Sequence, residues 1–167
     1  MTHPRILIAC IGNIFLGDDG FGTEVARRLA GRSLPPGVVL KDFGICGVDL
    51  SYALLEPYEL VILVDACAQG GEPGSVYLIA PDVSDANLAN HVPVSVDMHG
   101  MNPTNVLRTI QSMGGAPSRI LLVGCEPADL GGEEGRLGLS DPVHAAVDEA
   151  IAMIETLISK EAVLQAQ

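Results

Sequence analysis

The feature that most constrains the fold of this chain is a regular alternation of short apolar runs with segments of helical periodicity. The run Leu60–Asp65 is apolar at every position before its final aspartate, which is typical of a central parallel strand buried on both faces. Parallel strands need crossover connections, and helices usually supply them. The alternation therefore predicts an α/β fold, a three-layer sandwich with a mostly parallel twisted central sheet flanked by helices on both faces.

The predicted elements follow one another without a linker, repeat or low-complexity tract. The predicted strands are Arg5–Cys10, Val38–Asp42, Leu60–Asp65 and Arg119–Gly124, with a short edge strand at Ser75–Ile79. The predicted helices are Gly22–Ala30, Val48–Leu55, Asn105–Met113 and a last helix that begins after Ser140.

The last helix carries the strongest local signals. Ser140 is suited to the N-cap, Asp141 favours the positive end of the helix dipole, and Pro142 fits a first turn. An apolar stripe then recurs at three- and four-residue steps, which predicts one buried face. The stripe consists of Val143, Val147, Ile151, Ile154 and Ile158.

Length and charge limit the number of domains and the kinds of partner. At roughly 150 residues per domain, the 167 residues predict a single domain over 1–167. Nine basic and twenty-one acidic residues give a net charge of −12. Such a chain repels phosphate backbones and anionic lipid, so the charge argues against nucleic-acid and membrane partners and favours a basic or cation-bearing one.

The cysteines and the N-terminus indicate a cytoplasmic protein. Cys10, Cys46, Cys67 and Cys125 form no CxxC pair and lie in apolar stretches, which favours reduced core thiols over the alternative of a thiolate metal site. The first apolar run, Ile6–Ile11, is too short for a signal peptide or a membrane span, and no later run approaches about 20 residues.

Polar residues interrupt the apolar pattern at three loops. The segment IGNIFLGDDGFG (11–22) carries Asp18 and Asp19 among glycines, Asp65 ends the most apolar strand, and SVDMHGMNPTN (95–105) carries His99. The carboxyl ends of parallel strands share one edge of a sheet, where α/β domains bind their ligands. Asp19, Asp65 and His99 are therefore expected to converge on one rim.

The residue types in this set favour a cation over a nucleotide. The first loop contains neither GxGxxG nor GxxxxGK[ST], and its two carboxylates would repel a phosphate. For Asp18 or Asp19 alone, capping of the following helix is an alternative. Asp65, at the end of a buried strand, needs hydrogen bonds, a cation or a proton. Two carboxylates and an imidazole suit nickel or zinc and leave positions open for water or a group of the substrate.

Taken together, these segments resemble the hydrogenase maturation endopeptidases over nearly the whole chain. The resemblance rests on ILIACIGNIFLGDDGFG (6–22), DFGICG (42–47), VILVDAC (61–67), the His99 loop, and LLVGCEP with LGLS (121–127 and 137–140). It implies a cytoplasmic endopeptidase, classed as aspartic-type, that removes a C-terminal extension from the precursor of a nickel–iron hydrogenase large subunit. Nickel in that precursor would be the recognition element.

The resemblance also assigns residues. Asp19, Asp65 and His99 would contact the metal, and Asp19, flanked by glycines, is the candidate base. Asp42, Gly44 and Gly47 would form a substrate-recognition loop. Many members read DGGTxG there, so the changes at Phe43 and Ile45 imply an altered choice of hydrogenase partner.

Three ligands without an obvious fourth imply that nickel arrives with the substrate and that the isolated protein holds no tightly bound metal. Nothing in the sequence demands more than a monomer. Two alternatives to the endopeptidase remain at this point: a non-catalytic nickel-binding chaperone, and a metal-dependent hydrolase with its own zinc.

Overall fold

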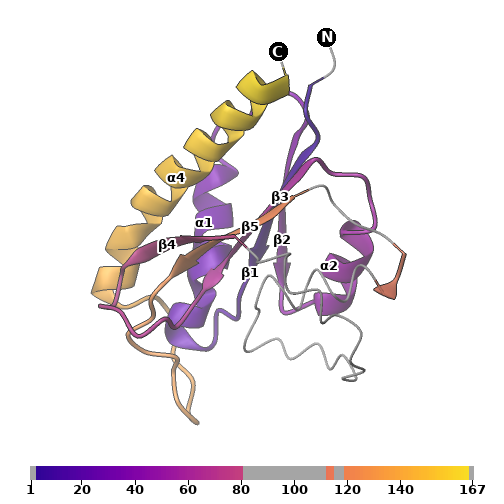
Figure 1. The fold of residues 1–167 in the computed structure, drawn as a ribbon. Helices are drawn as coiled ribbons and strands as arrows, with labels where there is room; N and C mark the ends of the chain where they lie inside the picture. The colour runs from indigo at the N-terminus through magenta and orange to yellow at the C-terminus, as the bar shows by residue number, and fades with distance from the viewer. Residues whose placement is uncertain (1–2, 81–111, 115–118, 166–167) are drawn as a thin grey trace.

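A five-stranded sheet forms the centre of the molecule (Figure 1). The computed structural model describes residues 3–80, 112–114 and 119–165. The strand order is β2-β1-β3-β5-β4. All neighbouring pairs are parallel except β4 with β5, which makes β4 an antiparallel edge strand. The strands are β1 (Ile6–Ile11), β2 (Val38–Gly44), β3 (Leu60–Ala66), β4 (Val76–Ile79) and β5 (Ile120–Cys125).

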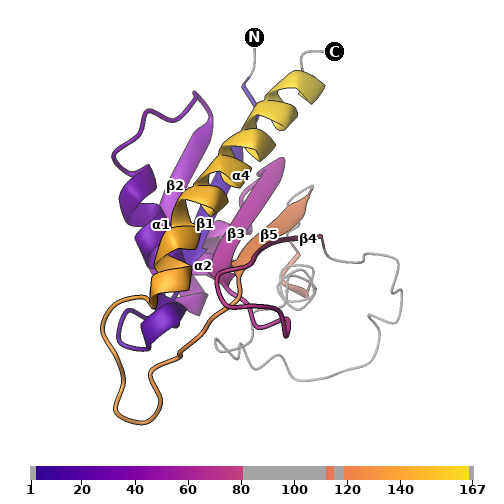
Figure 2. The same cartoon turned by 90° about the vertical axis from the view of Figure 1, so that its left-hand side faces the viewer.

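Helices cover both faces of this sheet, so the predicted three-layer α/β architecture is confirmed. The helices are η1 (Gly17–Gly20), α1 (Phe21–Leu29), α2 (Gly47–Ala53) and α4 (Asp141–Gln165). The helices α1 and α4 lie side by side on one face, and α2 lies on the other (Figures 1 and 2). The side chains of alternate strand residues pack into two separate hydrophobic clusters, one on each face of the sheet.

The predicted elements that fall on described residues are confirmed to within a few residues at their ends. Every member of the apolar stripe of α4 is buried. The expected helix Asn105–Met113 lies largely outside the described residues, although Ser112 is helical and a turn follows at 113–114. The expectation of four core thiols is only half right. Cys10 and Cys125 are buried, whereas Cys67 is half-buried and Cys46 is exposed, because Cys46 lies in the turn between β2 and α2.

The topology creates a crevice at the carboxyl ends of β1 and β3. The chain passes from β1 to β2 on one side and then crosses back to β3 on the other, so the two connections diverge between β1 and β3. A bulge lies at the same edge, because Cys10 pairs with Asp42 whereas Ile11 pairs with Gly44. The bulge turns the end of β2 and directs the next residues over the crevice.

The close contact of α1 with the sheet depends on a glycine. A methyl group at Gly22 would overlap the backbone carbonyl oxygens of Ile11 and Val64, which cannot move without disturbing β1 and β3. We therefore expect Gly22→Ala to lower the free energy of unfolding by about 3 kcal/mol, measured by urea denaturation. Gly31→Ala is the matched control, because its methyl group would come no closer than 3.6 Å to a neighbouring atom. Equal stabilities of the two variants would contradict this account of the packing.

Among the described residues, no helix combines the length and the apolar character needed to cross a membrane.

Candidate active site

A cavity of about 260 Å³ opens at the carboxyl ends of β1, β2 and β3. It is lined by the end of β1 and the following loop, by η1, by the turn after β2 and by the end of β3. The lining residues are Ile11, Gly12, Asn13, Asp19, Gly44, Ile45 and Asp65. The structure therefore brings together two of the three predicted metal-contacting residues, Asp19 and Asp65. The third, His99, lies outside the described residues.

Asp19 is held at the cavity by the turn that begins just after β1. The backbone N–H of Asn13 donates to the backbone oxygen of Asp19 and to its carboxylate Oδ2, both at 3.1 Å. These two contacts join Asn13, at the start of the loop after β1, to Asp19 in η1. Asp19 consequently occupies a hydrogen-bonded helical turn, which orients its half-buried carboxylate towards the cavity.

The neighbouring Asp18 points the other way, is fully buried and binds the segment that precedes α4. Its carboxylate accepts hydrogen bonds from the backbone N–H groups of Ala128 (2.8 Å), Asp129 (2.9 Å) and Ser140 (2.7 Å). It also accepts one from the Ser140 hydroxyl at 2.9 Å. The alternative in which Asp18 or Asp19 caps the following helix is wrong, since Gly20 occupies the N-cap of α1 and no side chain bonds there.

Asp65 is the buried member of the cavity pair. Only 5% of its surface is exposed, and the Ala66 N–H donates to its Oδ1 at 2.8 Å. Burial raises the pKa of the Asp65 carboxyl well above its usual range, and the negative charge of Asp19 raises it further, whereas the Ala66 N–H acts in the opposite direction. The fold thus keeps a carboxyl group where its ionised form is disfavoured, which is common at functional sites.

We expect Asp65→Asn to stabilise the fold at neutral pH. A carboxyl whose pKa is raised by folding adds stability below its unfolded pKa and loses that contribution as the pH rises through its folded pKa. The amide carries no charge to bury, and its oxygen can still accept the Ala66 hydrogen bond. The gain at pH 7 should be about 1 kcal/mol, and it should shrink as the pH falls towards about 4.

Urea denaturation at several pH values measures this effect. Asp129→Asn is a control for which the opposite change in the free energy of unfolding is expected, because hydrogen bonds from the Gly131 N–H and from Arg136 lower the pKa of Asp129. That variant should lose stability at neutral pH. An Asp65→Asn variant less stable than the parent chain at pH 7 would contradict the burial argument.

The three residues expected to recognise the substrate occupy different positions. Gly44 lines the cavity, Asp42 is exposed at the end of β2, and Gly47 is buried at the start of α2. The Asp42 carboxylate accepts a hydrogen bond from the Gly44 N–H at 2.9 Å and is 3.4 Å from the Thr23 hydroxyl of α1. Gly44 adopts φ +54°, which an L side chain rarely adopts. Asp42 is therefore hydrogen-bonded to a residue of the cavity lining, Gly44, without lining the cavity itself.

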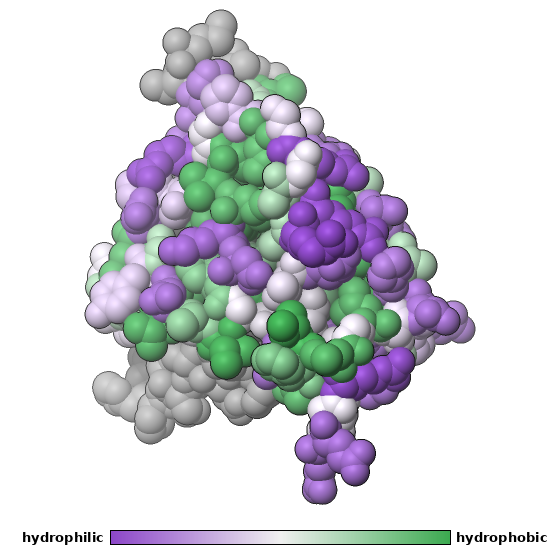
Figure 3. All heavy atoms as spheres, turned by 180° about the vertical axis from the view of Figure 1, so that it is seen from behind, coloured by the Kyte–Doolittle hydropathy of each residue, from purple (hydrophilic) through white to green (hydrophobic). Residues whose placement is uncertain are grey.

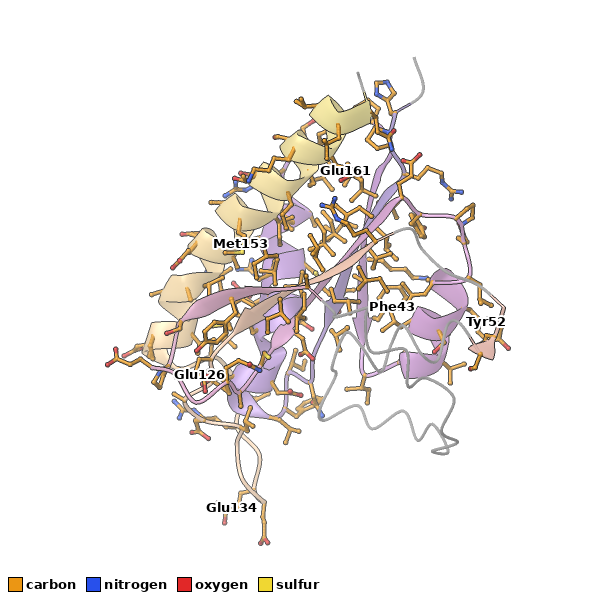
Figure 4. All side chains as sticks on the ribbon, viewed as in Figure 1. Phe43, Tyr52, Glu126, Glu134, Met153 and Glu161 are labelled. Atoms are coloured by element: carbon orange, nitrogen blue, oxygen red, sulfur yellow. The ribbon has the colours of Figure 1, made fainter. Side chains whose placement is uncertain are left out.

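Two supporting residues escaped prediction from the sequence. Asn13 closes the Asp19 turn and lines the cavity, and an asparagine directly after a glycine in a strand-end loop is the available signal. Glu126, after β5, accepts hydrogen bonds from the Gln69 N–H at 2.7 Å and the Tyr77 hydroxyl at 3.0 Å (Figure 4). It ties the loop after β3 to β4 and β5, a long-range contact that no local pattern reveals.

The oxygen donors of the cavity suit a divalent cation. Asp19 and Asp65 provide hard oxygen ligands in a half-enclosed space, and a cation would offset their mutual repulsion. Within 3–80, 112–114 and 119–165, no group of three or more His, Cys, Asp or Glu residues could hold a metal ion. The described side chains thus supply two ligands, fewer than a closed structural metal site requires.

Two solved structures that share this fold are those of hydrogenase maturation peptidases. The hydrogenase maturating endopeptidase HybD from Escherichia coli matches with a TM-score of 0.75 and 26% identity, over 94% of this chain and 93% of that chain. The hydrogenase 2 maturation peptidase from a Thaumarchaeota archaeon matches with a TM-score of 0.67 and 32% identity, over 92% of this chain and 97% of that chain. The fold and the likeness of sequence thus define a peptidase.

The sequence comparisons identify which peptidase family this is. The family model described as hydrogenase maturation protease matches residues 23–157. The hydrogenase expression/formation protein HupD of Rhodobacter capsulatus is 34% identical over 149 residues, covering 89% of this chain and 68% of that protein. The chain belongs to the hydrogenase maturation protease family. Membership in a peptidase family favours the endopeptidase over a non-catalytic nickel chaperone.

Proposed function

We propose that this chain removes the C-terminal extension from the nickel-loaded precursor of a nickel–iron hydrogenase large subunit. The observation that carries the proposal is the pair of carboxylates, Asp19 and Asp65, in one cavity at the carboxyl edge of the sheet. Besides burial, charge repulsion from Asp19 raises the pKa of the Asp65 carboxyl, and nickel held by the precursor would offset that repulsion when it enters the cavity. Cleavage would then depend on prior loading of the precursor.

In the proposed reaction, the two carboxylates have different tasks. Asp65, buried at the end of β3, contacts the nickel together with His99. Asp19 is half-buried at the mouth of the cavity, where it contacts the same cation and takes a proton from the attacking water. The nickel would position the scissile peptide bond next to the Asp19 carboxylate. It would also polarise the carbonyl group of that peptide bond. This assignment places the protease within the aspartic-type class by its reacting group.

The turn formed by Asp42 and Gly44, with Gly47 behind it, is the proposed contact for the substrate next to the nickel. Asp42 holds Gly44 in its left-handed conformation, so Ile45 projects as an exposed side chain at the cavity. Ile45 replaces a smaller residue common in the family, and we infer that this exposed side chain selects the hydrogenase partner. The same expectation for Phe43 needs correction, because Phe43 is buried in the hydrophobic cluster under α2 and presents no surface to a partner. We also propose that residues 1–167 act as one domain and as a cytoplasmic monomer.

The remaining alternative is a hydrolase that holds its own zinc. Metal analysis of the isolated protein separates the two. We expect substoichiometric metal after purification without chelator, because two carboxylates and one imidazole hold a cation weakly without further ligands. Tightly bound zinc at one ion per chain would favour the alternative.

Co-expression with candidate large-subunit precursors tests the function itself. Each precursor is produced with and without nickel in the medium, in the presence and absence of this chain, and its size is measured. The proposal expects one precursor to shorten only when both nickel and the chain are present. Shortening without nickel would contradict the recognition mechanism, and no shortening of any precursor would contradict the function.

A further inference from the structure

Four large apolar side chains lie exposed on the loop after β1 and on the loop between β5 and α4, and we call them the apolar rim. They are Ile14, Phe15, Leu130 and Leu137, with exposed fractions of 48%, 64%, 49% and 73%. Ile14 and Phe15 directly follow Asn13, which lines the cavity. Figure 3 shows apolar surface gathered at the lower edge of the molecule, at the base of a hydrophilic projection. Through Ile14 and Phe15, the rim thus adjoins the proposed active site.

The segments that carry the apolar rim are fastened to one another by backbone hydrogen bonds. The Arg136 N–H donates to the Phe15 oxygen, and the Gly17 N–H donates to the Arg136 oxygen, both at 2.8 Å. The Asp18 N–H donates to the Asp129 oxygen at 2.8 Å. Residues 15–18 therefore bind both arms of the loop between β5 and α4, one next to Leu130 and the other next to Leu137.

Two aspartates hold this loop in shape. Asp18 binds its two ends through Ala128, Asp129 and Ser140, as described above. The Asp129 carboxylate accepts a hydrogen bond from the Gly131 N–H at 2.8 Å and pairs with Arg136 at 2.6 Å. A loop serving only as a connection needs no such fixation, and large apolar side chains on it would favour collapse onto the core. The fixation keeps them presented to solvent, which lowers the entropic cost of binding a partner.

The charge around the apolar rim indicates the complementary surface. Glu133 and Glu134 are exposed between Leu130 and Leu137, and Glu134 lies at the tip of the projection (Figure 4). Within the loop, Arg136 is already paired with Asp129. A partner that fits must therefore offer an apolar patch bordered by lysine or arginine side chains.

We propose that the apolar rim docks the folded body of the large-subunit precursor, through an apolar patch bordered by basic residues, while the nickel-bearing segment enters the cavity. This inference rests on the proposed function and adds a second contact to it. The cavity alone, at about 260 Å³, receives only a few residues of a substrate. Docking at the rim supplies binding energy away from the scissile bond and restricts cleavage to a folded, loaded precursor.

Steady-state cleavage of nickel-loaded precursor by purified variants tests the rim. Phe15→Ser with Leu137→Ser should raise KM about tenfold or more and leave kcat at saturating precursor within about twofold. Glu133→Lys with Glu134→Lys should raise KM several-fold and weaken its dependence on salt. The matched control is Val163→Ser with Leu164→Ser, because both side chains are 60% exposed at the far end of α4. The control should leave KM and kcat unchanged.

An unchanged KM in the Phe15/Leu137 variant, or an equal rise in the control, would overturn the proposal. A second copy of this chain is the other occupant that the rim could have, and sedimentation of the same proteins tests for it. The proposal would also be overturned if the parent chain is a dimer, the Phe15/Leu137 variant is a monomer, and KM is the same for both. Binding of the precursor, measured without cleavage, separates this inference from the proposed function. If the parent chain binds the precursor through the rim yet cleaves nothing, the proposed function fails and the docking surface stands.

Discussion

The Asp19→Asn variant is expected to cleave nickel-loaded precursor between about 100-fold and 10,000-fold more slowly than the parent chain, the range over which a positioned base accelerates a reaction. The amide has almost the size of the carboxylate, and its oxygen can still accept the Asn13 hydrogen bond that orients the side chain. What it lacks is the ability to take a proton from water. The loss should therefore appear in kcat without a loss of stability, because the substitution also removes the repulsion between Asp19 and Asp65.

Initial rates from gel or mass analysis of the precursor measure this loss. Asp148→Asn is the matched control, because it makes the same chemical change on the exposed side of α4, where Asp148 pairs with Arg28. That variant should retain full activity. A normal cleavage rate for Asp19→Asn would show that Asp19 is not the base and would leave it, at most, a role in contacting the metal.

Replacing Asp18 with alanine is expected to lower the free energy of unfolding by about 3–5 kcal/mol, because a buried charged acceptor is removed from several donors at once. The N–H groups of Ala128, Asp129 and Ser140 would then lack the carboxylate that accepts their hydrogen bonds. The loop before α4 would then be held to residues 15–18 by backbone hydrogen bonds without the Asp18 carboxylate, and the Asp19 turn would lose part of its support. Urea denaturation measures the loss, and faster hydrogen exchange at the three amides locates it.

A substitution in the same loop provides the control for Asp18→Ala. The Asp129 carboxylate also binds a backbone N–H and an arginine, but its side chain is 41% exposed, so water can replace these contacts. Asp129→Ala should therefore cost about 1 kcal/mol or less. A loss of less than about 1 kcal/mol for Asp18→Ala would contradict the role of Asp18 as the fixed point of this loop.

The layers of the fold could be predicted because local patterns report burial. An uninterrupted apolar run such as Leu60–Val64 has few uses other than a central strand, and the stripe of α4 reports its buried face directly. Placing Asp65 at the strand end followed from the same pattern. Its approach to Asp19 followed from the shared edge of parallel strands, and the common cavity confirms it.

Contacts between distant segments could not be predicted in the same way. Asp18 and Asp19 are identical in type and adjacent in sequence, yet one faces the cavity and the other is buried against residues 128–140. The geometry of η1 decides which is which, and the sequence pattern contains no information on it. The same applies to the bulge opposite Cys10, which takes Asp42 away from the cavity lining and leaves Gly44 there.

The most direct test of the account is the intact mass of a purified precursor after incubation with this chain. Two samples of the same large-subunit precursor are compared, one loaded with nickel and one without. The account predicts that only the loaded sample loses mass, in a single step that corresponds to its C-terminal extension. Equal cleavage of the two samples, or cleavage of the nickel-free sample alone, would contradict it.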